Sequence, residues 1–104
     1  MSDVADITVE EILAKLREAA PALKAEGVTK LAVFGSRARG DARPDRDLDV
    51  LVDTTARGAS PPFDFFEALR IVEDTIGLRA QISMRDLLKP RVAKRIADDL
   101  IEVF

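Results

Sequence analysis

The sequence of 104 residues contains no cysteine, histidine, tyrosine or tryptophan. The absence of cysteine and histidine excludes disulfides, zinc sites of the Cys/His type and catalysis by either side chain. Any chemistry must therefore use carboxylates, hydroxyls, lysine, arginine, backbone amides or a hard metal ion held by oxygen.

A surplus of positive charge is missing too. The chain has 16 Lys and Arg against 19 Asp and Glu, a net charge of −3, so we expect no direct binding of nucleic acid. No apolar run approaches the roughly 18–20 residues of a membrane span. The acidic start, MSDVADITVEE, does not resemble a signal peptide. We therefore expect a protein with no membrane association and a cytoplasmic location.

The sequence pattern predicts one domain over residues 1–104, of the α/β (α+β) class. Apolar residues make up 47% and interspersed charged residues 34%, as in a small globular domain. We expect a small mixed sheet of about three strands flanked by helices, with the strands over 30–34, 47–53 and 78–83. Helices are expected over 8–27 (with a kink or a restart at Pro21), 36–40, 61–77, 83–89 and 91–101.

Aromatic residues are few and lie close together in the sequence. Phe65 and Phe66 fall on the predicted apolar face of the helix that Pro61 and Pro62 open, and Phe63 lies nearby. We expect these three phenylalanines to form core or to cover the sheet. The alternative is that some of them serve a partner interface.

The stretch from Val33 to Asp53 (VFGSRARGDARPDRDLDVLVD) carries the clearest functional pattern. A predicted strand ends at Gly35 and Ser36, and Ser36 can cap the short helix that begins there. A glycine lets backbone amides approach a bound group closely, and a helix start offers unpaired N–H groups to an anion. This half of the pattern predicts a phosphate site, although such a turn by itself is common.

The second half of the pattern is the pair Asp47 and Asp49 at the start of the next strand. Residues two apart on a strand project from the same face, so the two carboxylates lie close and repel unless a cation lies between them. Magnesium is the natural cation, because it binds carboxylate and phosphate oxygens together. The two halves predict a site for a nucleoside triphosphate with Mg2+. The arginines of this stretch can bind its phosphates. They are Arg37, Arg39, Arg43 and Arg46.

Gly35-Ser36, ten residues and then Asp47-Leu48-Asp49 resemble the signature of the nucleotidyltransferase superfamily. The segment GSRARGDARPDRDLDVLV is similar in sequence to the minimal nucleotidyltransferases, the antitoxin partners of HEPN-type toxins. The resemblance implies that Gly35, Ser36, Arg37 and Arg39 bind ATP and that the catalytic Asp47 and Asp49 hold Mg2+. It implies transfer of AMP to a hydroxyl, in the antitoxin branch a tyrosine of the toxin. The resemblance also allows the protein to form a homo-oligomer or a hetero-oligomer.

The chain departs from the family pattern at two positions. Active members carry a third carboxylate on a later strand, and the matching residue here is Gln81, which brings no charge and cannot act as a base. Asp53 is expected about 13 Å from Asp49, too far to replace it. The sequence leaves Asp45 and Asp74 open as substitutes.

The other departure is Arg46, which stands where a small polar residue is common and can pair with Asp47. Two alternatives to an active transferase therefore stay open. One is an antitoxin that neutralises its partner by binding alone. The other is a nucleotide-binding subunit of a larger transferase.

Overall fold

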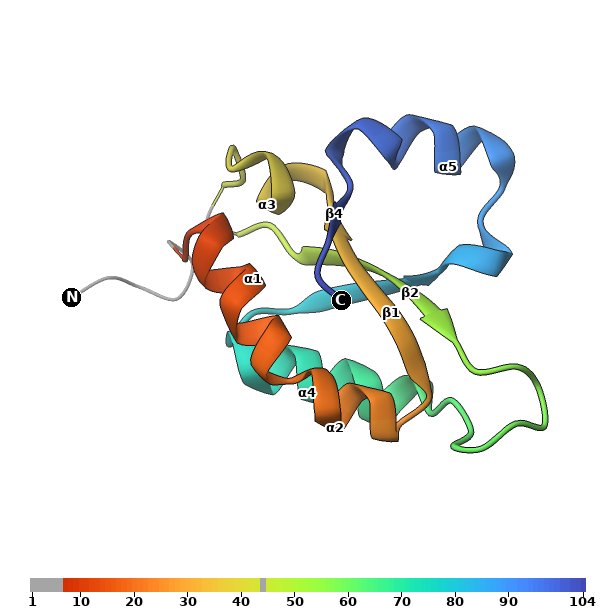
Figure 1. The fold of residues 1–104 in the computed structure, drawn as a ribbon. Coiled ribbons are helices and arrows are strands. Elements are labelled where there is room, and N and C mark those ends of the chain that lie inside the picture. Colours follow the sequence, from red (N-terminus) through yellow and green to blue (C-terminus); the bar gives the residue numbers. More distant parts are fainter. Residues whose placement is uncertain (1–6, 44) are drawn as a thin grey trace.

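The described part of the chain folds into a four-stranded sheet with helices packed against it (Figure 1). The computed structural model describes residues 7–43 and 45–104. The elements in order are α1 (Val9–Glu18), α2 (Ala20–Ala25), β1 (Val28–Phe34), α3 (Gly35–Arg39), β2 (Leu48–Thr54), α4 (Phe65–Ile76), β3 (Ala80–Met84), the 3₁₀ turn η2 (Arg85–Leu87), α5 (Pro90–Ile96), the 3₁₀ turn η3 (Ala97–Asp99) and β4 (Ile101–Glu102).

The sheet is mixed, as the sequence predicts, with the strand order β3-β2-β1-β4. β1 runs antiparallel to β2 and to β4, whereas β2 and β3 are parallel. The antiparallel pairing sets Phe34 opposite Asp49, and the parallel pairing sets Asp49 beside Gln81. The sheet register thus brings the end of β1 and the starts of β2 and β3 to one edge.

The fourth strand corrects the expected terminal helix over 91–101. Helix α5 ends at Ile96, and Ile101 lies in β4, where it pairs with Val33 of β1. Asp98 and Asp99 would place negative charge at the negative end of a continued helix, which is unfavourable. Pairing with β1 instead brings Ile101 and Val103 against the core.

Helices α1, α2 and α4 lie together on one side of the sheet and enclose the core (Figure 1). Thr8 caps α1 as predicted, since its hydroxyl accepts a hydrogen bond from the Glu11 N–H at 3.1 Å. Of the kink or restart expected at Pro21, the structure shows the restart, because α1 ends at Glu18 and α2 follows with Pro21 in its first turn. The core joins these helices to β1 and β2 through buried aliphatic side chains, among them Ile12, Leu16, Leu23, Leu31, Val50, Val52, Val72 and Ile76.

The other helices differ from the expectation in two places. α4 does not begin at Pro61 but at Phe65, where the Asp64 side chain caps it by accepting from the Glu67 N–H at 3.0 Å. The expected helix over 83–89 is reduced to the turn η2, and Pro90 begins α5 instead of breaking a helix. Proline fits there because the first residue of a helix needs no N–H donor.

Phe66 is not a core residue, contrary to the expectation. Its side chain is 79% exposed, while Phe63 packs against the core. The buried stripe of α4 consists of Ala68, Val72 and Ile76, and this spacing turns Phe66 toward solvent.

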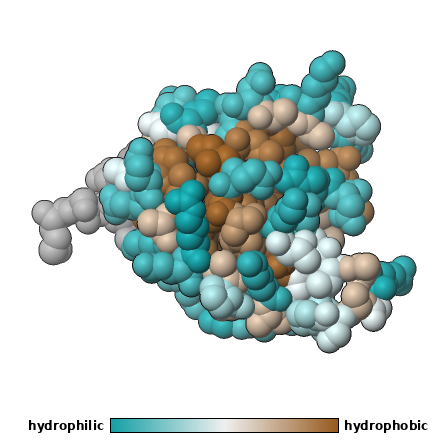
Figure 2. Space-filling view, viewed as in Figure 1, coloured by the Kyte–Doolittle hydropathy of each residue, from teal (hydrophilic) through white to brown (hydrophobic). Residues whose placement is uncertain are grey.

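On the face shown in Figure 2, polar side chains surround an apolar area near the upper centre. In the described part of the chain, no helix has the length and apolar character to cross a membrane.

Candidate active site

The turn between β1 and α3 requires glycine for two independent reasons. Gly35 has a φ of +78°, in the left-handed region that favours glycine. A Cβ at this position would lie 2.6 Å from the Asp49 Oδ2 atom, closer than real contacts allow. The missing side chain therefore lets the Asp49 carboxylate lie directly against the turn. The predicted closeness of the two sequence halves is thus built into the backbone.

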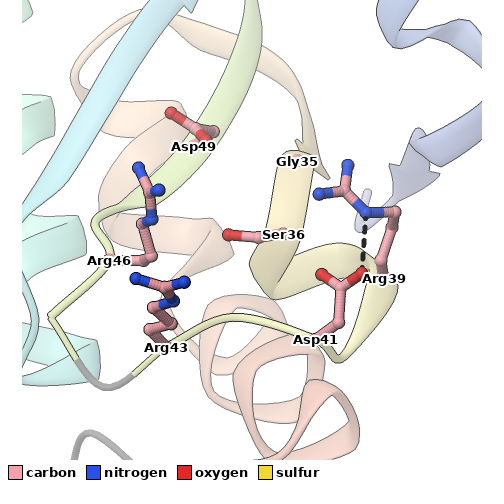
Figure 3. Close-up of a pocket in the computed structure, with 7 residues that line it drawn as sticks. All are labelled: Gly35, Ser36, Arg39, Asp41, Arg43, Arg46 and Asp49. Atoms are coloured by element: carbon pink, nitrogen blue, oxygen red, sulfur yellow. Dashed lines mark hydrogen bonds and ion pairs between the residues drawn. The ribbon is translucent and has the colours of Figure 1, made fainter.

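Ser36 lies within the first turn of α3 instead of capping it, because Phe34 occupies the cap position. Its hydroxyl points into the space between α3 and the start of β2 (Figure 3). The early N–H groups of a helix lack partners within the helix, so they and this hydroxyl can donate to an anion. The turn therefore offers hydrogen-bond donors at the place where the sequence predicts a phosphate site.

Asp47, Asp49 and Gln81 line one cavity of about 280 Å³, together with Ser36, Asp45 and Arg46. Asp47 precedes β2, and Asp49 is its second residue. The Gln81 side-chain amide donates to the Asp47 Oδ2 atom at 3.4 Å. The structure thus brings together the two aspartates and the position expected to carry a third carboxylate.

The Asp49 carboxyl has a pKa above its ordinary value of 3.8, first because burial disfavours its charge and second because Asp47 repels it. The nearby Arg46 guanidinium opposes this shift. Partly desolvated, mutually repelling carboxylates that open into a cavity are suited to a divalent cation, which offsets both penalties. Among the described residues there is no cluster of three or more Asp, Glu, His or Cys that would hold a metal. Asp47 and Asp49 therefore fit Mg2+ as a pair, with substrate oxygens and water as the remaining ligands.

A second cavity, of about 470 Å³, adjoins the first and is rich in arginine (Figure 3). Its lining residues are Gly35, Ser36, Arg39, Asp41, Arg43, Arg46 and Asp49. Ser36, Arg46 and Asp49 belong to both cavities. An arginine-lined space suits phosphates, and the acidic space beside it suits a cation that binds the same phosphates.

The arginines near the site hold different positions. Arg39 lines the larger cavity but is engaged by Asp41 at 3.2 Å and by Asp99 of η3 at 2.7 Å. These two bonds raise the pKa of the Arg39 guanidinium. In the part of the chain that the structure describes, Arg46 does not form the ion pair with Asp47 that the sequence allows.

Arg37 lines neither cavity, although the sequence suggested it as a nucleotide-binding residue. Its side chain is 5% exposed and donates to main-chain carbonyls of the loop before β2. Nη2 lies 3.0 Å from the Arg46 oxygen and 3.5 Å from the Arg43 oxygen, and Nε lies 3.3 Å from the Arg46 oxygen. A helix of five residues is too short for its sequence periodicity to reveal this inward position.

Three other aspartates, Asp45, Asp53 and Asp74, were considered as replacements for the third carboxylate, and the structure places them differently. Asp53 pairs with Arg85 at 2.6 Å, and Asp74 pairs with Arg70 at 2.9 Å on α4. Neither lines the two cavities of the site. Asp45 lies in the lining of the smaller cavity, so it is the one of the three at the site.

Residues 11–103 match the model of the nucleotidyltransferase domain family, and the chain belongs to that family. Among individual relatives, it is 34% identical over 101 residues to the protein adenylyltransferase MntA of Thermococcus cleftensis, covering 96% of this chain and 100% of that one. A solved structure of a suspected minimal nucleotidyltransferase is 33% identical, with a TM-score of 0.67 over 91% of this chain and 95% of the other.

A more distant solved structure is a mutant of the toxin–antitoxin pair MntA–HpeT. It superimposes with a TM-score of 0.61 at 10% identity, over 94% of this chain and 73% of the matched chain. At that identity the likeness establishes the shared fold alone.

Proposed function

We propose that the protein is an antitoxin of the minimal nucleotidyltransferase type, which transfers AMP from ATP to a hydroxyl of a partner toxin. The observation that carries the proposal is the meeting of the Gly35 turn with the Asp49 carboxylate, from which Asp47 lies two residues away. The relationship to a named protein adenylyltransferase over almost the whole chain supports AMP as the transferred group.

In this proposal the larger cavity binds the triphosphate and the smaller cavity binds the metal ion. Ser36 and the arginines of the larger cavity would bind the triphosphate, and the Asp47–Asp49 pair would hold Mg2+. Bound Mg2+ would supply positive charge against the phosphate oxygens. The acceptor oxygen would bond to the α-phosphorus as the bond to pyrophosphate breaks, and the hydroxyl proton would leave to solvent or to a site carboxylate. Arg39 and Arg43, which line the larger cavity, would stabilise the charge on the pyrophosphate.

The acceptor must belong to another chain if it is a tyrosine, because this sequence has none. We propose a tyrosine of a HEPN-type toxin, and hence at least a transient hetero-oligomer. Dependence on ATP would place the reaction in the cytoplasm. The test is incubation of the two proteins with Mg2+ and ATP labelled at the α-phosphate. Label on the toxin, with loss of its toxicity, is the expected result, and an unlabelled toxin contradicts transfer.

Gln81 favours a second candidate, an antitoxin that neutralises its partner by binding alone. The residue stands beside Asp49 in the sheet and donates a hydrogen bond where the family pattern has a carboxylate. The Asp47→Asn/Asp49→Asn variant distinguishes the two functions. Full neutralisation by this variant supports binding alone, whereas lost neutralisation with retained complex formation supports transfer.

A further inference from the structure

We propose that Arg37 is a positioning residue that holds the loop between α3 and β2, and through it both cavities of the site. The inference rests on the proposed nucleotide site but assigns Arg37 a different part from the phosphate contact that the sequence suggested. The Arg37 side chain lies next to this loop, and its guanidinium donates hydrogen bonds to a main-chain oxygen of the loop, that of Arg46.

The loop has little structure of its own to fix it. Among its described residues, 41–43 and 45–47, none belongs to a helix or strand. Its start is anchored at α3, where the N–H groups of Gly40 and Asp41 donate to the Ser36 oxygen at 3.0 and 3.1 Å. Its far end contains a turn in which the Arg46 N–H donates to the Arg43 oxygen at 3.0 Å. Arg37 donates to the main-chain oxygens of Arg43 and Arg46, the two residues that this hydrogen bond joins, so it fixes the turn relative to α3.

The turn carries the groups that would bind substrate. The side chains of Arg43 and Arg46 point from it toward Ser36 and Asp49 (Figure 3). The Arg46 carbonyl that Arg37 binds is also the one bonded to the nitrogen of Asp47. One buried guanidinium therefore sets the direction of two phosphate-facing cations and the position of the first carboxylate.

Arginine is the side chain suited to this task. Its planar guanidinium offers donors in a fixed fork, so it can hold two carbonyls of one turn at once. A lysine ammonium keeps the charge but lacks that fork. Arg37→Lys therefore removes the geometry of the contact while the buried positive charge remains.

The test compares Arg37→Lys with Arg17→Lys. Arg17 also donates from Nε to a main-chain oxygen, that of Val103 at 3.4 Å, but it lies in α1 outside both cavities. Binding of a fluorescent ATP analogue is measured with Mg2+ present, alongside hydrogen exchange of the loop amides. For Arg37→Lys we expect an affinity about tenfold or more below the wild type, as for the loss of one bond to a charged group, and faster exchange at residues 45–47. Arg17→Lys should match the wild type in both.

Equal affinity of Arg37→Lys and the wild type overturns the positioning role and leaves the proposed function standing. A wild type that binds no Mg-ATP overturns both. If Arg37→Lys does not fold, the Arg37 Nε–H resonance of the wild type gives the answer. We expect it to exchange slowly and to move little when Mg-ATP binds. A large shift on binding would place Arg37 on the phosphates and overturn the proposal.

Discussion

Gln81 donates a hydrogen bond to Asp47 at 3.4 Å while it stands beside Asp49 in the parallel pairing of β2 and β3. It is therefore in contact with one of the two proposed metal ligands and in register with the other. A carboxylate at this position would share the same cavity. The backbone frame of a three-carboxylate site is thus present, and one charge is missing from it.

Gln81→Asp is expected to strengthen Mg2+ binding and to raise the rate of AMP transfer by about 10²-fold or more, because it adds both a charged ligand and a base. Gln81→Asn is the matched control, since it has the shape of aspartate without the charge. The rate of toxin labelling at several Mg2+ concentrations measures the effect. Equal rates for the aspartate and asparagine variants would contradict the role assigned to this position.

Asp49→Asn is expected to stabilise the metal-free protein while abolishing its stabilisation by Mg2+. The pKa of Asp49 is raised in the fold, so the folded state binds this proton more tightly than the unfolded state. The free energy of unfolding should therefore fall as the pH rises from about the ordinary pKa of 3.8. Asparagine carries no charge at any of these pH values, so the variant does not lose this part of the free energy of unfolding. Thermal unfolding of both proteins near pH 7, with Mg2+ and with EDTA, measures it, and a lower melting temperature for the variant in EDTA would contradict the account.

Gly35→Ala is expected to lower the affinity for Mg-ATP, whereas Gly58→Ala is expected to leave it unchanged. Both glycines have positive φ values, +78° and +84°, so both substitutions cost about 1–2 kcal/mol of backbone strain. Nothing lies within 4 Å of a Cβ at Gly58, whereas a Cβ at Gly35 meets the Asp49 carboxylate at 2.6 Å. Only Gly35→Ala should therefore weaken Mg-ATP binding. The comparison is made by calorimetric titration, and similar affinities for the two variants would refute this explanation.

Asp99→Asn is expected to increase the affinity for ATP several-fold at low salt. Asp99 competes for the Arg39 guanidinium at 2.7 Å, and its removal leaves that cation available to the phosphates of the larger cavity. Asp98→Asn is the control, because Asp98 forms no ion pair within the described chain. If Asp99→Asn weakens binding instead, the contact orients Arg39 for the nucleotide and does not compete with it.

Local patterns in the sequence were sufficient for most of the fold and for the centre of the site. Short apolar or alternating runs predicted β1, β2 and β3 to within a few residues. The turn chemistry of Gly35 and the spacing of Asp47 and Asp49 predicted that these residues lie close together. These features depend on near neighbours in the chain.

The features that the sequence did not reveal depend on distant contacts. β4 forms because Ile101 pairs with Val33, which lies 68 positions earlier in the chain, and the helical pattern before β4 gives no sign of that partner. Phe66 is exposed because the helix orientation follows the stripe of Val72 and Ile76. Arg37 resembles the other arginines of its stretch, and only the folded loop distinguishes it from them.

In the proposed site, Asp47 and Asp49 bind the nucleotide through a shared Mg2+ ion. The most direct test of this arrangement is a calorimetric titration of ATP into the wild type and into Asp47→Asn/Asp49→Asn, each with Mg2+ and with EDTA. The account predicts that the wild type binds ATP tightly only with Mg2+ and that the double variant loses this dependence on the metal. A double variant that binds Mg-ATP as well as the wild type would contradict it.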